Sequence, residues 1–260
     1  MEEYQVSIAI IWRRQTENKP MTPRMKSRIK AMQHGLAILS ITTVLIGATG
    51  VFAGQAAEQP TEQIIAQTDA ENFVNRGLQR SRQGDLRGAI EDFNQAIRVN
   101  PNYLPAYQAR GNLLSSQGNQ QGAIADYNQA LRLQNTYAPA YIGRASAHSA
   151  MGNQEAAIDD YSRALKLNNR YVQAYIGRGA AYAALLDFNR ALNDFNQALG
   201  QDPNNPAAYY NRGSVLALRG DRTNAIGDFQ QAAELFRQQQ NQVLYQQALN
   251  RIRLLQRQRN

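Results

Sequence analysis

The residues with the clearest capacity for chemistry are five arginines and five aspartates that recur in step along the chain. The arginines repeat at one constant interval, and an aspartate follows each of them at a second constant interval. A guanidinium and a carboxylate can form a bidentate ion pair, whereas a row of arginines can also bind an anionic ligand. The ten residues are Arg76, Arg110, Arg144, Arg178 and Arg212, with Asp92, Asp126, Asp160, Asp194 and Asp228.

Two hypotheses follow from this pattern. The first is a structural ladder of Arg–Asp ion pairs, formed either within one repeating unit or between neighbouring units, and the sequence reasoning favours pairs between units. Such pairs contribute more to register than to net stability, because desolvation offsets most of their attraction. The rival hypothesis is a row of arginines that lines a groove and binds an acidic ligand.

No other group of residues has the pattern of a catalytic or metal-binding site. The sequence contains no cysteine and only two histidines, His34 and His148. Thiolate metal sites, cysteine nucleophiles and disulfide frameworks are therefore excluded, and a histidine metal cluster is too sparse to form. A GxSxG elbow and a glycine-rich phosphate loop are also absent from the sequence. We predict a protein that is not an enzyme, with no catalytic residue, no metal and no cofactor.

A 34-residue period extends over residues 70–239 and defines five blocks, 70–103, 104–137, 138–171, 172–205 and 206–239. Each block has an aromatic residue at its fourth and twenty-fourth positions, a small residue at its eighth, and alanine at its twentieth and twenty-seventh. Two helical patterns, called A and B below, flank a turn that contains glycine in four blocks and Leu186 in the fourth. Small residues let helices A and B approach closely, and stacked blocks bury one continuous core.

These positions resemble the tetratricopeptide repeat (TPR) family. The resemblance covers residues 70–239 and implies an all-α, right-handed superhelical solenoid of antiparallel helix pairs. It also implies a concave groove lined by helix A positions two, five, nine and twelve, which binds an extended segment of another protein. The lysines with which some relatives clamp acidic chaperone tails are missing, so we expect a segment that is not strongly acidic. The expected groove residues are Val74, Gln108, Asn112, Ile142, Ser146, Ile176, Tyr210 and Ser214.

Charge is concentrated at the two ends of the chain. The formal net charge is +8, but residues 57–250 contain equal numbers of acidic and basic side chains. The neutral body argues against nucleic acid as a partner, because nucleic-acid binding needs a basic face. Residues 57–69 are expected to be a polar linker, and residues 240–260 an amphipathic capping helix with a basic tail.

The N-terminal segment resembles an export signal. Residues 1–34 are expected to be a disordered tail and a basic n-region, and translation starts at either Met1 or Met25. Residues 35–56 then form either a cleaved signal region or an uncleaved anchor, with membrane association possible through 35–54. Both alternatives place the repeats on the exported side of a membrane, in a periplasm or an equivalent lumen.

Together these features predict a non-enzymatic scaffold, a TPR adaptor or assembly factor that binds other proteins. The alternative is a structural module that associates with itself and binds no peptide. The sequence leaves the partner and the oligomeric state open.

Overall fold

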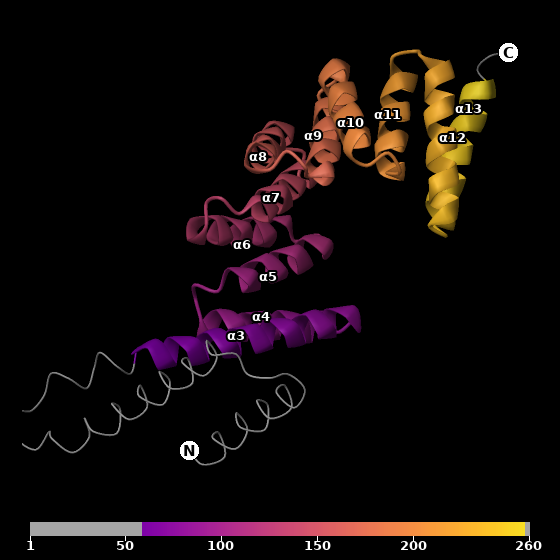
Figure 1. Cartoon of the computed structure of the whole chain (residues 1–260). Helices are drawn as coiled ribbons and strands as arrows, with labels where there is room; N and C mark the ends of the chain where they lie inside the picture. Colours follow the sequence, from indigo (N-terminus) through magenta and orange to yellow (C-terminus); the bar gives the residue numbers. More distant parts are fainter. Residues whose placement is uncertain (1–58, 258–260) are drawn as a thin grey trace, which may run out of the picture. The chain divides into compact units, whose positions relative to one another are not determined.

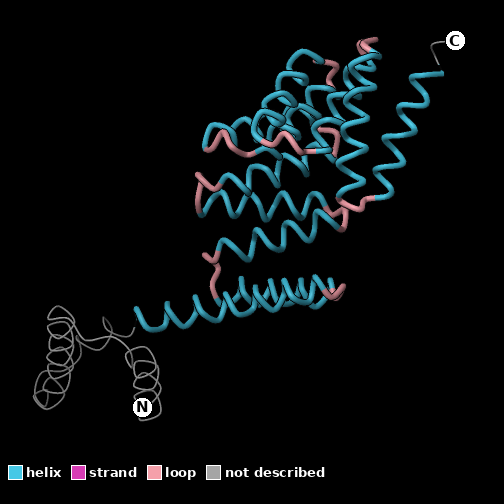
Figure 2. The backbone as a smooth tube through the Cα atoms, turned by 45° about the vertical axis from the view of Figure 1, so that its right-hand side comes forward, coloured by secondary structure: helices cyan, strands magenta, loops and turns pink. Residues whose placement is uncertain are grey.

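The structure, a computed structural model, describes residues 59–257. Within this range the chain forms helices and connecting loops without any strand (Figures 1 and 2). The expected all-α repeat fold is therefore confirmed. The segments expected to be a tail (1–34) and a signal or anchor (35–56) lie outside the described residues. None of the described helices combines the length and apolar character needed to span a bilayer.

The helices alternate between A and B along the stack (Figure 1). The A helices are α3 (Gln59–Arg82), α5 (Leu104–Ser116), α7 (Ala138–Ala150), α9 (Val172–Ala184) and α11 (Pro206–Leu218). The B helices are α4 (Leu86–Val99), α6 (Gln120–Leu133), α8 (Gln154–Leu167), α10 (Phe188–Gln201) and α12 (Arg222–Gln238), and α13 (Gln242–Arg257) follows them.

The segment expected to be a polar linker differs from that expectation. From Gln59 onward it is helical and continuous with the first A helix, so that α3 is 24 residues long. Pro60 stands at the start of the helix, where its fixed φ is favourable, and no glycine or proline follows until Gly77. Helix-forming Glu, Gln and Ala residues therefore continue the helix through a stretch whose polarity suggested a linker.

The core is built from the repeating small and aromatic side chains. The alanines at the twentieth position of each block are fully buried, and the aromatic residues at the twenty-fourth are at most 4% exposed. Consecutive A helices contact one another (α5 with α7, α7 with α9, α9 with α11), and no comparable contact joins consecutive B helices among the described residues. The A helices therefore form the inner side of the stack.

Helix α13 closes the C-terminal end of the stack by packing on α12. Its buried residues are Ala248 and Ile252, and Leu249 and Leu255 pack beside them against Phe229. These residues belong to the apolar stripe expected of a capping helix, whose other side is polar.

The A–B turns contain one residue in an unfavourable backbone conformation. Gly84, Gly118, Gly152 and Gly220 have φ between 81° and 86°, and Leu186 takes the same place in the fourth block with φ 61°. The left-handed region costs a residue with a Cβ about 1–2 kcal/mol. The leucine side chain recovers little of this by packing, because it is 73% exposed.

We expect Leu186→Gly to stabilise the fold by about 1 kcal/mol, since glycine adopts this backbone freely but loses more entropy on folding. Urea denaturation of the two proteins measures the difference. Gly152→Leu serves as the reciprocal variant and should destabilise by a similar amount. A stability loss in Leu186→Gly would contradict the assignment of strain to this turn.

Candidate functional site

Each repeating arginine is paired with the aspartate of its own repeat. In the third repeat, Arg144 Nε and Nη2 donate to Asp160 Oδ2 and Oδ1, both at 2.7 Å. The same two-bond geometry joins Arg110 to Asp126, Arg178 to Asp194 and Arg212 to Asp228, with distances of 2.6–2.8 Å. Arg76 makes both bonds to Asp92 as well.

The third guanidinium nitrogen reaches the preceding repeat. Arg144 Nη1 donates to Asn128 Oδ1 at 2.5 Å, and Arg178 Nη1 donates to Ser162 Oγ at 3.0 Å. The equivalent bonds run from Arg110 to Asn94 and from Arg212 to Asn196. Pairing between repeats, the alternative that the sequence reasoning favoured, is therefore wrong for the aspartates. The ion pair lies within a repeat, and a neutral side chain makes the link to the neighbour.

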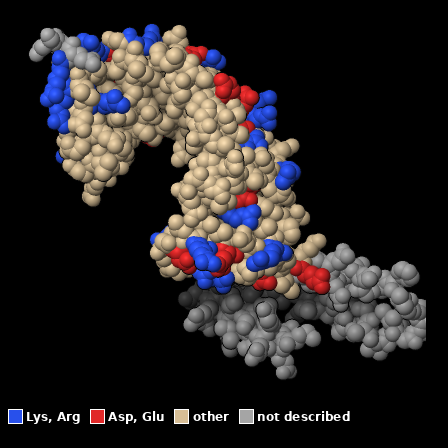
Figure 3. Space-filling model, turned by 180° about the vertical axis from the view of Figure 1, so that it is seen from behind, with Lys and Arg blue, Asp and Glu red and all other residues tan. Residues whose placement is uncertain are grey.

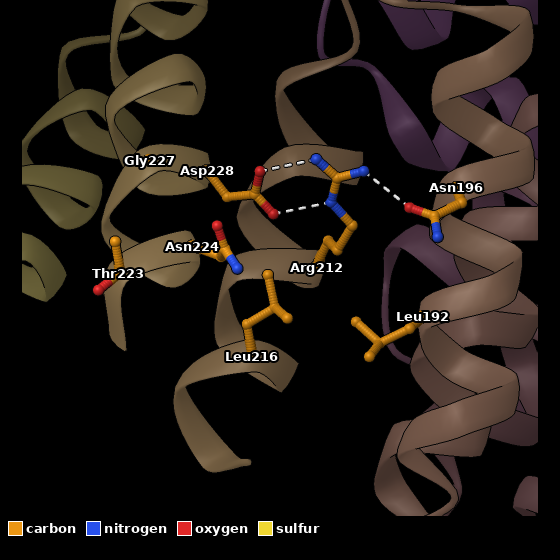
Figure 4. A pocket seen from close by; sticks show the side chains of 8 residues that line it. All are labelled: Leu192, Asn196, Arg212, Leu216, Thr223, Asn224, Gly227 and Asp228. Atoms are coloured by element: carbon orange, nitrogen blue, oxygen red, sulfur yellow. Dashed lines mark hydrogen bonds and ion pairs between the residues drawn. The ribbon is translucent and has the colours of Figure 1, made fainter. Parts of the chain in front are cut away.

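Figure 4 shows this arrangement for Arg212, which lies between Asp228 of α12 and Asn196 of α10. The five aspartates are at most 7% exposed. Each guanidinium also lies over the aromatic ring three residues before it, at 5.0–5.9 Å from the ring centre.

The hydrogen bonds to the carboxylates raise the pKa of the arginines. From Arg110 to Arg212 all three guanidinium nitrogens are occupied, so this geometry does not support an arginine row that binds an acidic ligand.

The expected groove residues divide into one buried residue and a set on the accessible inner surface. Val74 is only 6% exposed and packs in a core cluster with Ala106 and Leu113 of α5. Its assignment to the groove is wrong, because the neighbouring A helix covers it. The accessible residues are Gln108, Asn112, Ile142, Ser146, Ile176, Tyr210 and Ser214.

Two of the accessible residues also satisfy buried tyrosines. Tyr127 Oη donates to Asn112 Oδ1 at 2.8 Å, and the hydroxyls of Tyr161 and Ser146 are 2.9 Å apart. Tyr127 is 2% exposed, and a buried hydroxyl without a partner would be costly. Asn112 and Ser146 therefore have a structural role that the sequence reasoning missed.

A signal for this role is present in the sequence. Each of these tyrosines is followed in the next block by a glycine, Gly143 or Gly177, at which an added Cβ would collide with the tyrosine ring. Blocks with phenylalanine at the twenty-fourth position are followed by Ala109 or Asn211 at the same place instead. In these two blocks, a tyrosine at the twenty-fourth position thus occurs together with a polar residue at the ninth position of the same block and a glycine in the next block.

Burial raises the pKa of Tyr127 to about 12, with the Asp126 carboxylate contributing. A tyrosine in the unfolded chain ionises near pH 10. The folded state therefore favours the neutral phenol, and this contribution to stability is complete below pH 10 and lost as the pH rises through 12. We expect the urea midpoint to fall over this range, and to fall less in Tyr127→Phe. An equal decline in both proteins would contradict this assignment.

Gln108 and Asn112 form a polar pair on the inner surface of α5. Asn112 Oδ1 accepts from both Tyr127 and Gln108 Nε2, the second bond at 3.0 Å. This fixes the amide orientation and leaves the Asn112 NH2 group as a donor toward solvent. Gln108 Oε1 is buried and has no hydrogen-bond partner among the described residues. The pair therefore offers one exposed donor, the Asn112 NH2 group, whereas Gln108 Oε1 is covered by the protein.

The A helices from α5 to α11 have no charged side chain apart from the paired arginines. Figure 3 shows one face of the stack, on which other residues (tan) predominate and charged side chains lie at both ends and along one edge between them. In the described part of the chain no cluster of His, Asp and Glu could hold a metal ion.

Sequence comparison finds repeat families over most of the described chain. Family models described as tetratricopeptide repeat match residues 70–103 and 179–241, and a model described as TPR repeat matches 111–152 and 147–185. No curated protein matches the chain.

Solved structures share the fold. The crystal structure of MamA is 26% identical, with 64% of this chain and 96% of that chain covered and a TM-score of 0.57. TTC0263, a thermophilic TPR protein of Thermus thermophilus, is 21% identical, covers 69% and 98% of the two chains, and has a TM-score of 0.60. YrrB, described as a TPR protein with an unusual peptide-binding site, is 21% identical, covers 75% and 98%, and has a TM-score of 0.55.

Proposed function

Because the chain belongs to the tetratricopeptide repeat family, we propose that it is a non-enzymatic adaptor or assembly factor that binds an extended segment of another protein, one that is not strongly acidic, along the A helices. TPR repeats are protein-interaction scaffolds, which supports the class of function. The peptide-binding site described for YrrB supports the view that this fold can accommodate a peptide.

The polar pair on α5 is the observation that carries this proposal. A segment in extended conformation presents backbone N–H and C=O groups that need partners when they leave water. The Asn112 Oδ1 atom is occupied by Tyr127 and Gln108, so the exposed Asn112 NH2 group can donate to a carbonyl of the segment. The lack of charged side chains other than the paired arginines on these helices favours a segment that is not strongly acidic, since an acidic side chain would lose its hydration there without gaining a free cation.

We propose that binding takes place on the exported side of a membrane, on the strength of the apolar segment 35–56 and the basic residues before it. A fusion of the full chain to alkaline phosphatase tests this, because that enzyme needs an oxidising compartment to become active. Export would be contradicted if the phosphatase fusion is inactive and a fusion of the same chain to a reporter that works only in the cytoplasm is active.

Site-specific photocrosslinking tests the binding surface itself. We expect p-benzoylphenylalanine at Ala180, an exposed inner-surface residue of α9, to form a covalent product with a partner protein in living cells. The matched control is the same amino acid at Asn193, an exposed residue of α10. Products from Asn193 alone would contradict the proposed surface. A dimer of this chain as the sole product would favour the self-association module instead.

A further inference from the structure

A pocket of about 330 Å³ lies between α11 and α13, at the C-terminal end of the inner surface. Its apolar walls come from Leu218 of α11, Phe229 of α12 and Leu254 and Leu255 of α13. Among the described residues that line the pocket, Arg251 is the only one with a charged side chain. The pocket is distinct from the Gln108–Asn112 pair, which lies three repeats earlier on α5.

The apolar walls are only partly covered by the fold. Leu218 of α11 is 69% exposed and Leu254 of α13 is 54% exposed, although both line the same pocket. Such side chains gain free energy when a further apolar group removes them from water. The pocket volume lies at the lower end of the range found for ligand sites, which suits one large apolar side chain.

Arg251 differs from the repeating arginines in having no carboxylate partner among the described residues. Its one hydrogen bond runs from Nε to Tyr210 Oη at a long 3.4 Å. Helix α13 contains Arg251, Arg253 and Arg257 and no acidic residue. The end of the inner surface therefore presents an unneutralised cation beside an apolar pocket.

Tyr210 adds a second donor in a fixed position. Its ring meets Phe229 edge-on, with centroids 5.2 Å apart and planes at 68°, a preferred geometry for an aromatic pair. Since Tyr210 Oη accepts from Arg251, its own O–H is left to donate. The Tyr210 hydroxyl and the Nη groups of Arg251, which lines the pocket, are therefore available as donors beside each other.

We propose that this pocket binds the C-terminal residue of a partner chain, with a large apolar side chain between Leu218 and Leu254 and its α-carboxylate on Arg251 and Tyr210. The inference rests on the proposed function, because the pocket continues the inner surface at Ser214 and Ala217. A free carboxylate supplies the single negative charge that Arg251 lacks. A second copy of the chain docked symmetrically on the pocket would instead bring two Arg251 side chains together.

Fluorescence anisotropy with defined peptides tests the assignment. The probe is a labelled decapeptide of Gly, Ser, Gln and Thr that ends in leucine with a free carboxylate. We expect the full-length protein to bind it about fivefold more tightly than the C-terminal amide. Replacing the last leucine by alanine should weaken binding about tenfold. Equal binding of acid and amide, or no binding of either, would overturn the proposal.

Two arginine variants test whether the difference in affinity between acid and amide peptides arises in the pocket. Arg251→Gln is expected to remove the difference between acid and amide peptides. Arg253→Gln, whose guanidinium bonds Asn250 of its own helix, should preserve it. An Arg251→Gln protein that still distinguishes acid from amide would overturn the role of Arg251.

The failure of this inference can be distinguished from failure of the proposed function. If the inner surface crosslinks to a partner at Ala180 while the peptide carboxylate has no effect, the pocket assignment is wrong and the scaffold function stands. Dodecanoate, which also combines a carboxylate with an apolar chain, serves as a competitor. Binding of dodecanoate without binding of the leucine peptide would overturn the peptide as ligand.

Discussion

Replacing Asp160 by alanine is expected to lower the free energy of unfolding by about 3 kcal/mol. Asp160 is 5% exposed, and its removal leaves the guanidinium of Arg144, 18% exposed, without its carboxylate. Removing one partner of a buried pair costs about 3–5 kcal/mol, and partial exposure of Arg144 places this pair at the lower end. Urea denaturation followed by circular dichroism measures the change.

Asp159 provides the matched control, since it is the adjacent carboxylate on the same helix but is exposed. Asp159→Ala should change the free energy of unfolding by less than about 0.5 kcal/mol. Equal losses in the two variants would contradict the ladder as a structural element. The combined change of Asp160→Leu with Arg144→Met should recover most of the loss, because it removes both charges together.

Asn112→Asp is expected to weaken partner binding at least tenfold while leaving stability nearly unchanged. The aspartate keeps an oxygen that accepts from Tyr127 and Gln108, as Asn112 does. It replaces the free NH2 donor by an acceptor, which faces the carbonyl of the bound segment and repels it. An unmade hydrogen bond to a charged group accounts for a loss of this size. The measurement is the affinity for the partner captured at Ala180.

Alanine is a poor choice at this position, because Asn112→Ala would also remove the acceptor of Tyr127. The loss of fold stability could then not be separated from a loss of affinity for the partner. Asn193→Asp introduces the same charge on the exposed side of α10 and controls for electrostatics. Equal binding by Asn112→Asp and Asn193→Asp would contradict the role of the Asn112 amide.

The repeat unit and its core could be predicted from the sequence because five blocks carry the same residue types in phase. The aspartate partner of each arginine could not be predicted, because the repeat period is the same for both possible pairings. Arg178 follows Asp160 and precedes Asp194 at nearly equal separations along the chain, so pairing in either direction repeats with the same period. Only the path of the chain in space separates the two arrangements.

The inner surface was only partly predictable for a related reason. A family pattern gives the position of a residue in its repeat but not its exposure, and Val74 in the first block packs in a core cluster with Ala106 and Leu113. The roles of Asn112 and Ser146 depend on tyrosine hydroxyls that lie on a different helix. The unsatisfied Gln108 Oε1 depends on burial, which residue type does not reveal.

Hydroxyl-radical footprinting of the full-length protein, with and without its captured partner, shows which side of the stack the partner covers. We predict that Tyr210 on the inner side becomes protected when the partner binds. Leu167, 43% exposed at the end of α8, should keep its reactivity. Protection of Leu167 with unchanged Tyr210 would place the partner on the B helices and contradict binding along the A helices.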